Sequence, residues 1–114
     1  MGFVVVSTTV DNAKKAKAIA GRIVAQRLAA CVQRVPIQSV YRWKGRIESA
    51  SEYLLLAKTR AALAPELTAF IRKIHPYELP EIIVTPITGG LAGYLEWIVR
   101  ETRGGKSARK GGKR

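Results

Sequence analysis

The chain has 114 residues, of which 47% are hydrophobic, and its formal net charge is +12. This length and composition predict one domain with a hydrophobic core, and no apolar run approaches the roughly 20 residues that a membrane-spanning helix needs. One cysteine and one histidine exclude an internal disulfide framework and a closed structural zinc site within one chain. We expect a cytoplasmic protein without a membrane partner.

The positive charge is unevenly distributed along the chain. Residues 103–114 contain six cations and no acid, and they lack large apolar side chains. We therefore predict a single domain over residues 1–102 and a disordered basic tail over residues 103–114. Such a tail could contact nucleic acid weakly, but a solubilising role is the interpretation that we favour.

A strand and a helix are predicted at the start of the chain. Residues 3–9 are rich in β-branched side chains, as is typical of a buried strand. Asp11 can cap the helix that follows, in which apolar residues recur at helical spacing from Ala16 to Leu28.

A long hairpin is predicted next. We expect a short strand over residues 30–35, an interruption at Pro36, and a continuation over residues 38–49. Residues 51–59 include a run that is apolar on both faces, as in a central strand. The tip of this hairpin should project beyond the core, and exposed aromatic strand surface of this kind is normally covered by another chain.

The second half of the chain predicts a helix, a strand and a short final helix. Pro65 suits a first helical turn, and apolar residues follow at helical spacing as far as Ile74. Residues 82–85 form a fourth strand that Pro86 stops, and residues 91–102 can form the last helix. The order βαββαβ predicts an α+β, ferredoxin-like sandwich with both main helices on one face of a four-stranded antiparallel sheet. Because no other helix is large enough to cover the opposite face, we expect an oligomer.

The link between the second helix and the fourth strand, residues 75–81, holds the only histidine. Pro76 and Pro80 keep the residues before them out of the helical region, so the link should be extended and stiff. A rigid polar loop is a natural place for a functional site. The plainer interpretation, which the local pattern favours, is that His75 only interacts with the C-terminus of the helix.

Five segments of the chain carry a resemblance to a known family. They are residues 27–32, 39–45, 55–59, 75–83 and 94–98. In this order they resemble the CutA divalent-cation-tolerance proteins, and the resemblance extends from about residue 4 to residue 102. It implies a compact homotrimer with a ferredoxin-like subunit, similar in architecture to the PII signalling proteins. It also implies a role in tolerance of divalent metals, with copper the ion usually named.

The resemblance also implies candidate metal ligands. Bacterial members with a proposed copper site carry a cysteine at the position of Ser7 and a first histidine at the position of Ile74, so only His75 is retained. Imidazole suits copper, and Glu78 and Glu81 are the carboxylates that could complete the site. We therefore expect weak binding of copper or another divalent cation.

A second candidate site is a cleft between subunits of the expected trimer. The hairpin of one subunit could reach the 75–81 link of the next and form an aromatic-walled pocket with Lys58 and Glu81 as polar handles. Such a pocket would suit a PII-like sensor that binds a small anionic ligand and signals to a protein partner. The plainer interpretation, which we favour, is that these aromatic residues form the core of a subunit interface, and an interface can also contain a pocket. The residues assigned to the cleft are Tyr41, Trp43, Lys58, Tyr77, Tyr94 and Trp97.

Catalytic chemistry is not indicated by the sequence. A single histidine leaves few ways to activate a nucleophile, and the chain contains no glycine-rich phosphate-binding motif. We therefore do not expect an enzyme.

Overall fold

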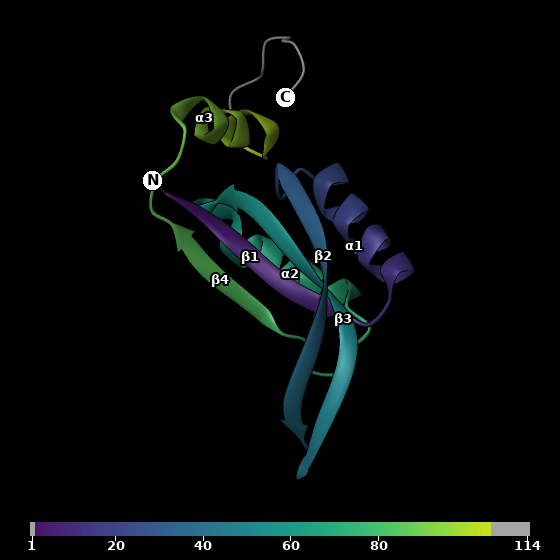
Figure 1. Cartoon of the computed structure of the whole chain (residues 1–114). Coiled ribbons are helices and arrows are strands. Elements are labelled where there is room, and N and C mark those ends of the chain that lie inside the picture. Colours follow the sequence, from purple (N-terminus) through teal and green to yellow (C-terminus); the bar gives the residue numbers. More distant parts are fainter. Residues whose placement is uncertain (1, 106–114) are drawn as a thin grey trace.

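The computed structural model describes residues 2–105 and has the ferredoxin-like α+β fold expected from the order of elements (Figure 1). Four strands form one antiparallel sheet in the order β2-β3-β1-β4. Helices α1 and α2 both lie on one face of this sheet. The elements are β1 (Phe3–Val10), α1 (Ala13–Ala25), β2 (Cys31–Trp43), β3 (Arg46–Arg60), the 3₁₀ turn η1 (Ala61–Leu63), α2 (Ala64–Ile74), β4 (Ile82–Ile87) and α3 (Ala92–Glu101).

The core lies between the sheet and the two main helices. Because side chains alternate along a strand, every second residue of β1 from Val4 and of β3 from Leu55 faces the helices and is almost fully buried. The helices contribute apolar residues at helical spacing, as the sequence predicts. The buried residues of this core include Val4, Val6, Val10, Ile19, Ile23, Leu55, Ala57, Leu67 and Ile71.

The opposite face of the sheet is not covered by α1 or α2 (Figure 1). Strand alternation and register place Val5, Leu54, Leu56 and Ile83 on this face, since these residues are out of phase with the buried set. They are half-buried or, for Ile83, 51% exposed. The fold therefore leaves an apolar sheet surface open.

Strand β2 is longer and more regular than expected. It continues through Pro36, which pairs with Tyr53 of β3, so the predicted interruption is wrong. Because β2 is an edge strand, the missing N–H of a proline can be accommodated there. Strand β3 also begins earlier than predicted, at Arg46, and β4 continues through Pro86 to Ile87, so the predicted stop at Pro86 is wrong as well. Lys44 and Gly45 between the strands have φ of 50° and 78°, as a two-residue type I′ hairpin turn requires.

The cap of α1 is Asn12 rather than Asp11. The Asn12 side chain accepts a hydrogen bond of 2.8 Å from the backbone N–H of Lys15. The Asp11 carboxylate lies one residue too early for that bond and instead forms an exposed ion pair of 3.8 Å with the Lys15 ammonium. None of the helices within residues 2–105 has both the length and the mean hydropathy that a membrane crossing requires.

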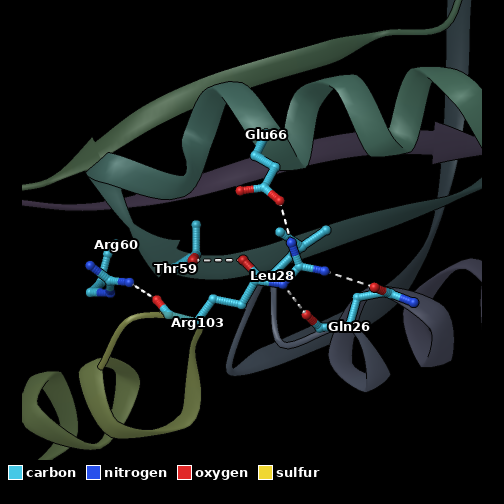
Figure 2. A network of polar contacts seen from close by, with 6 residues as sticks. All are labelled: Gln26, Leu28, Thr59, Arg60, Glu66 and Arg103. Carbon is cyan, nitrogen blue, oxygen red and sulfur yellow. Dashed lines mark hydrogen bonds and ion pairs between the residues drawn. The ribbon is translucent and has the colours of Figure 1, made fainter. Parts of the chain in front are cut away.

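The C-terminal end of the described chain is tied to the domain by Arg103 (Figure 2). Its guanidinium donates to the backbone and side-chain oxygens of Gln26, each at 2.8 Å, and pairs with Glu66 of α2. Its backbone N–H donates to the Arg27 carbonyl at 2.9 Å, and its own carbonyl accepts from Arg60. The contacts of the domain therefore extend beyond the predicted boundary at residue 102. Residues 106–114, the rest of the predicted tail, lie outside the described residues.

Candidate functional site

A groove with a volume of about 910 Å³ lies between the β2–β3 hairpin and the loop that joins α2 to β4. Ser39, Tyr41 and Trp43 line its hairpin wall, because alternate residues of a strand point to the same side. The loop supplies the other wall through residues 77–81. A groove of this size fits a small organic molecule.

The loop is fixed in place by His75, which is buried at the C-terminal end of α2. The Nδ1 atom accepts a hydrogen bond of 3.1 Å from the backbone N–H of Tyr77. The Nε2 atom therefore carries the proton and donates to the Thr9 carbonyl of β1 at 2.8 Å. Both ring nitrogens are thus occupied by hydrogen bonds, and the imidazole joins the loop to the sheet.

A second connection, between Tyr77 and Glu52, joins the loop to the hairpin. The Tyr77 hydroxyl donates a hydrogen bond of 2.7 Å to Oε2 of Glu52, whose side chain is buried in β3 at 7% exposure. Burial raises the pKa of the Tyr77 hydroxyl well above its ordinary value, and the Glu52 hydrogen bond and the negative charges of Glu52 and Asp11 raise it further. The tyrosine therefore stays a neutral donor under physiological conditions.

The charges along the groove are all acidic. Among the described residues, the groove is lined by four carboxylates, and no lysine or arginine lines it. They are Asp11, Glu52, Glu78 and Glu81. In a chain that carries 20 cations and 8 acids, this is a marked local reversal of charge.

The residues assigned to the cleft separate into two groups. Tyr41, Trp43 and Tyr77 line the groove together with Glu81, and they do so within one chain. Lys58 lies elsewhere on β3, where its ammonium donates to the side chain of Gln33. Lys58 therefore does not line the groove within one chain.

Tyr94 and Trp97 also lie away from the groove. They pack against each other on α3 with ring centroids 5.3 Å apart. Helix α3 lies at the opposite end of the molecule from the hairpin tip (Figure 1). These two residues therefore do not contribute to the groove within one chain.

Two groove residues, Asp11 and Glu52, were not predicted from the sequence. The sequence offered one indication that Glu52 has a special role, because this acid lies two residues before an apolar run in β3. Its position in the groove depends on the register of the hairpin, which pairs Glu52 with Ile37. That register follows from the two-residue turn at Lys44 and Gly45.

The predicted metal ligands are not gathered around one point. His75 has both nitrogens engaged and does not line the groove, whereas Glu78 and Glu81 do. Within residues 2–105, no group of three or more His, Cys, Asp or Glu side chains is placed to hold a metal ion. Of the two positions that differ from bacterial copper sites, Ser7 bonds to the Ile83 carbonyl at 3.5 Å and Ile74 packs against the core. The donor set therefore does not fit a tight metal site in this conformation.

The structure defines a ferredoxin-like protein with a groove beside a projecting hairpin. Residues 4–101 match the family model described as CutA1 divalent ion tolerance protein, and the chain belongs to this family.

Relatives with known names agree with this assignment. The chain is 48% identical over 101 residues to chloroplastic Protein CutA of Arabidopsis thaliana, covering 88% of this chain and 56% of that one. It is 44% identical over 99 residues to the divalent-cation tolerance protein CutA of Thermus thermophilus, covering 86% and 96%. The chain spans about half the length of several curated relatives, including the human Protein CutA.

Solved structures support the same assignment. The crystal structure of CutA1 from Oryza sativa superposes with a TM-score of 0.88 at 44% identity, covering 91% of this chain and 96% of that one. The Thermus thermophilus protein superposes with a TM-score of 0.84 at 42% identity, covering 88% and 98%.

Proposed function

We propose that this protein acts in the tolerance of divalent cations and that it does so as a homotrimer. Membership of the CutA1 divalent ion tolerance family supports the first part. The observation that carries the second part is the apolar sheet face that α1 and α2 leave uncovered. Proteins rarely leave an apolar face of this kind exposed to water, and two further copies of the chain would cover it.

The projecting hairpin adds to the surface that needs cover. Val40 and Ile47 near its tip are 72% and 71% exposed, and the Trp43 indole is 37% exposed. Large apolar and aromatic side chains of this kind are enriched at subunit interfaces. Trp43 shares the side of Leu54 and Leu56, whereas Val40 and Ile47 lie on the other side of the hairpin, so both sides of its tip carry side chains that a neighbouring chain could cover.

The assembly is tested by native mass spectrometry and light scattering at micromolar concentration. We expect a mass three times that of the 12.5 kDa chain. Ile83→Glu, which places a charge on the open sheet face, should dissociate the assembly, whereas Val24→Glu on the outer side of α1 should not. A wild-type monomer under these conditions would contradict the proposal.

The tolerance function is tested by growth of the host without this gene in raised copper and zinc. Wild-type protein supplied in trans should restore growth, and Ile83→Glu should restore less of it if the assembled form is the active one. Equal sensitivity to both metals with and without the gene would argue against a role in cation tolerance. Fractionation of the same cells tests the expected cytoplasmic location.

Metal binding by the chain itself, on this proposal, is weak. A copper or zinc ion that uses His75 must first displace a hydrogen bond from Thr9 or Tyr77, and this cost lowers the affinity. Calorimetric titration should give micromolar or weaker binding to wild type, loss in His75→Ala, and a gain in Ile74→His through a second imidazole. Equal copper binding by wild type and His75→Ala would mean that His75 is not a copper ligand.

A further inference from the structure

The outer surface of the two main helices is strongly basic. Helix α1 carries four cations and no acid, and α2 carries two cations and one acid. All of these residues are exposed, because the apolar residues of both helices take the side that faces the sheet. This helical layer lies opposite the open sheet face, so the trimer that we propose does not need to cover it (Figure 1). Its six cations are Lys14, Lys15, Lys17, Arg22, Arg72 and Lys73.

Few of these cations are neutralised within the chain. In the part of the chain that the structure describes, Lys15 is the only one of the six with an acidic partner, the Asp11 carboxylate at 3.8 Å. Glu66, the one acid of the two helices, pairs with Arg103 instead. Like charges at this density repel one another unless an anion lies among them, so the helical layer favours a polyanionic partner.

Arg22 connects the basic sides of the two helices. Its guanidinium lies 5.6 Å from the centroid of the Phe70 ring of α2, which holds a cation over the seam between the helices. A hollow of about 190 Å³ beside it is lined by Lys15 and Arg22 and by Ile74 and Pro76 at the end of α2. These two cations are the only charged residues among the described residues that line the hollow, so a negative group of the partner would lie between two positive ones.

The class of partner follows from the apolar side chains that the helical layer lacks. Among the described residues, Val24 is the only large apolar side chain on α1 or α2 that is exposed. An acidic protein would need apolar or aromatic anchors, and an anionic membrane would need apolar side chains that enter the lipid. Single-stranded nucleic acid would need aromatic faces for its bases. Duplex nucleic acid needs none of these, since contacts of lysine and arginine with phosphates supply most of its non-specific affinity.

The length of α1 agrees with this partner. Its 13 residues form a helix of about 20 Å, which spans about six base pairs of a duplex. We propose that the helical layer binds the phosphate backbone of duplex nucleic acid without base-specific contacts, and that Lys15 and Arg22 lie on either side of one phosphate. This surface is separate from the basic tail of residues 103–114. The proposal goes beyond the tolerance function and does not depend on it.

The test is the fluorescence anisotropy of a labelled DNA duplex of about 20 base pairs, titrated with the full chain between about 50 and 200 mM salt. We expect saturable binding that weakens steeply as salt rises and that is equal for a duplex of shuffled sequence. Lys17→Gln, Arg22→Gln and Lys73→Gln should each weaken binding about threefold or more. Each should also reduce the slope of log affinity against log salt by about 1, because one phosphate contact is lost.

Two controls separate the helical layer from net charge. Lys44→Gln removes the same charge at the hairpin tip, away from α1 and α2, and should leave affinity and slope unchanged (Figure 1). Lys110→Gln removes it from the tail and should weaken binding less than Arg22→Gln does. Absence of binding at low salt, wild-type slopes in all three helix variants, or equal losses in either control would each overturn the proposal. Native mass spectra of the same samples separate it from the proposed function, because a trimer that leaves the duplex free overturns only the helical-layer proposal.

Discussion

The Tyr77 hydroxyl donates a hydrogen bond of 2.7 Å to the Glu52 carboxylate, and this bond connects the loop after α2 with strand β3. The two residues are 25 positions apart in the sequence, so the bond forms only when the hairpin and the loop are both in place. It joins two residues that line the groove and fixes the carboxylate that has the lowest exposure there. The same pair also makes the stability of the fold sensitive to alkaline conditions.

The stability of the wild-type protein should decline above about pH 10 in part through Tyr77. Its pKa in the folded state is raised above the unfolded value of 10.0. The folded state therefore holds this proton more tightly, and that contribution is complete below about pH 10 and is lost as the pH rises through the folded pKa. Urea unfolding between pH 8 and pH 11 should show a shallower decline for Tyr77→Phe. Parallel declines in the two proteins would contradict this account.

Removal of the His75 ring should destabilise the fold by about 2 kcal/mol or more. His75→Ala leaves the Thr9 carbonyl and the Tyr77 N–H without their hydrogen bonds and opens space at a buried position. Chemical denaturation at pH 7.5 measures the change. Lys73→Ala, at an exposed position two residues earlier, is the control and should change stability by less than about 0.5 kcal/mol. Similar losses in both variants would mean that the imidazole has no special structural role.

Gly45→Ala should cost about 1 kcal/mol or slightly more, for a purely conformational reason. The φ of Gly45 is 78°, yet an added Cβ would meet no atom within 4 Å. Gly89→Ala is the matched control, because a Cβ there also meets nothing within 4 Å and no left-handed backbone is involved. It should be neutral or slightly stabilising. Thermal unfolding of the two variants measures the difference, and equal melting temperatures would argue against a strained turn.

Truncation should show that the domain extends to Arg103. A chain that ends at residue 105 should keep the melting temperature of the full chain, because residues 106–114 have no large apolar side chain to bury. A chain that ends at residue 102 loses the hydrogen bonds to Gln26 and Arg27 and should be less stable by about 1–2 kcal/mol. The exposed ion pair with Glu66 adds little to this figure. Equal stability of both truncated chains would mean that the domain ends at residue 102, as the sequence predicts.

The order of elements was predictable because hydrophobic periodicity changes clearly between strands and helices in this chain. The errors arose where a local rule competes with tertiary context. A proline usually interrupts a strand, but Pro36 lies in an edge strand and is tolerated. Arg103 belongs by composition to a basic tail, but its guanidinium finds carbonyl and carboxylate acceptors that only the folded domain brings together.

The groove was predictable in part. The aromatic residues of the hairpin and the loop were identified because their types and proline context are visible in the sequence. The formation of the groove within one chain was not predictable, because it depends on how far the hairpin bends toward the loop. The role of His75 was also ambiguous, since a helix-end histidine can bind metal or fix a loop, and only the positions of Thr9 and Tyr77 distinguish these uses.

The two-residue turn at Lys44 and Gly45 does not line the groove, but it determines which side chains of β2, and therefore which charges, face the groove. Side chains alternate along β2, so a one-residue insertion or deletion in the turn would reverse which of them face the loop. Arg42 would then take the side now held by Tyr41 and Trp43 and would bring a guanidinium to the carboxylates. Changes of loop length at this tip would therefore change the charge of the groove walls without a substitution in either strand.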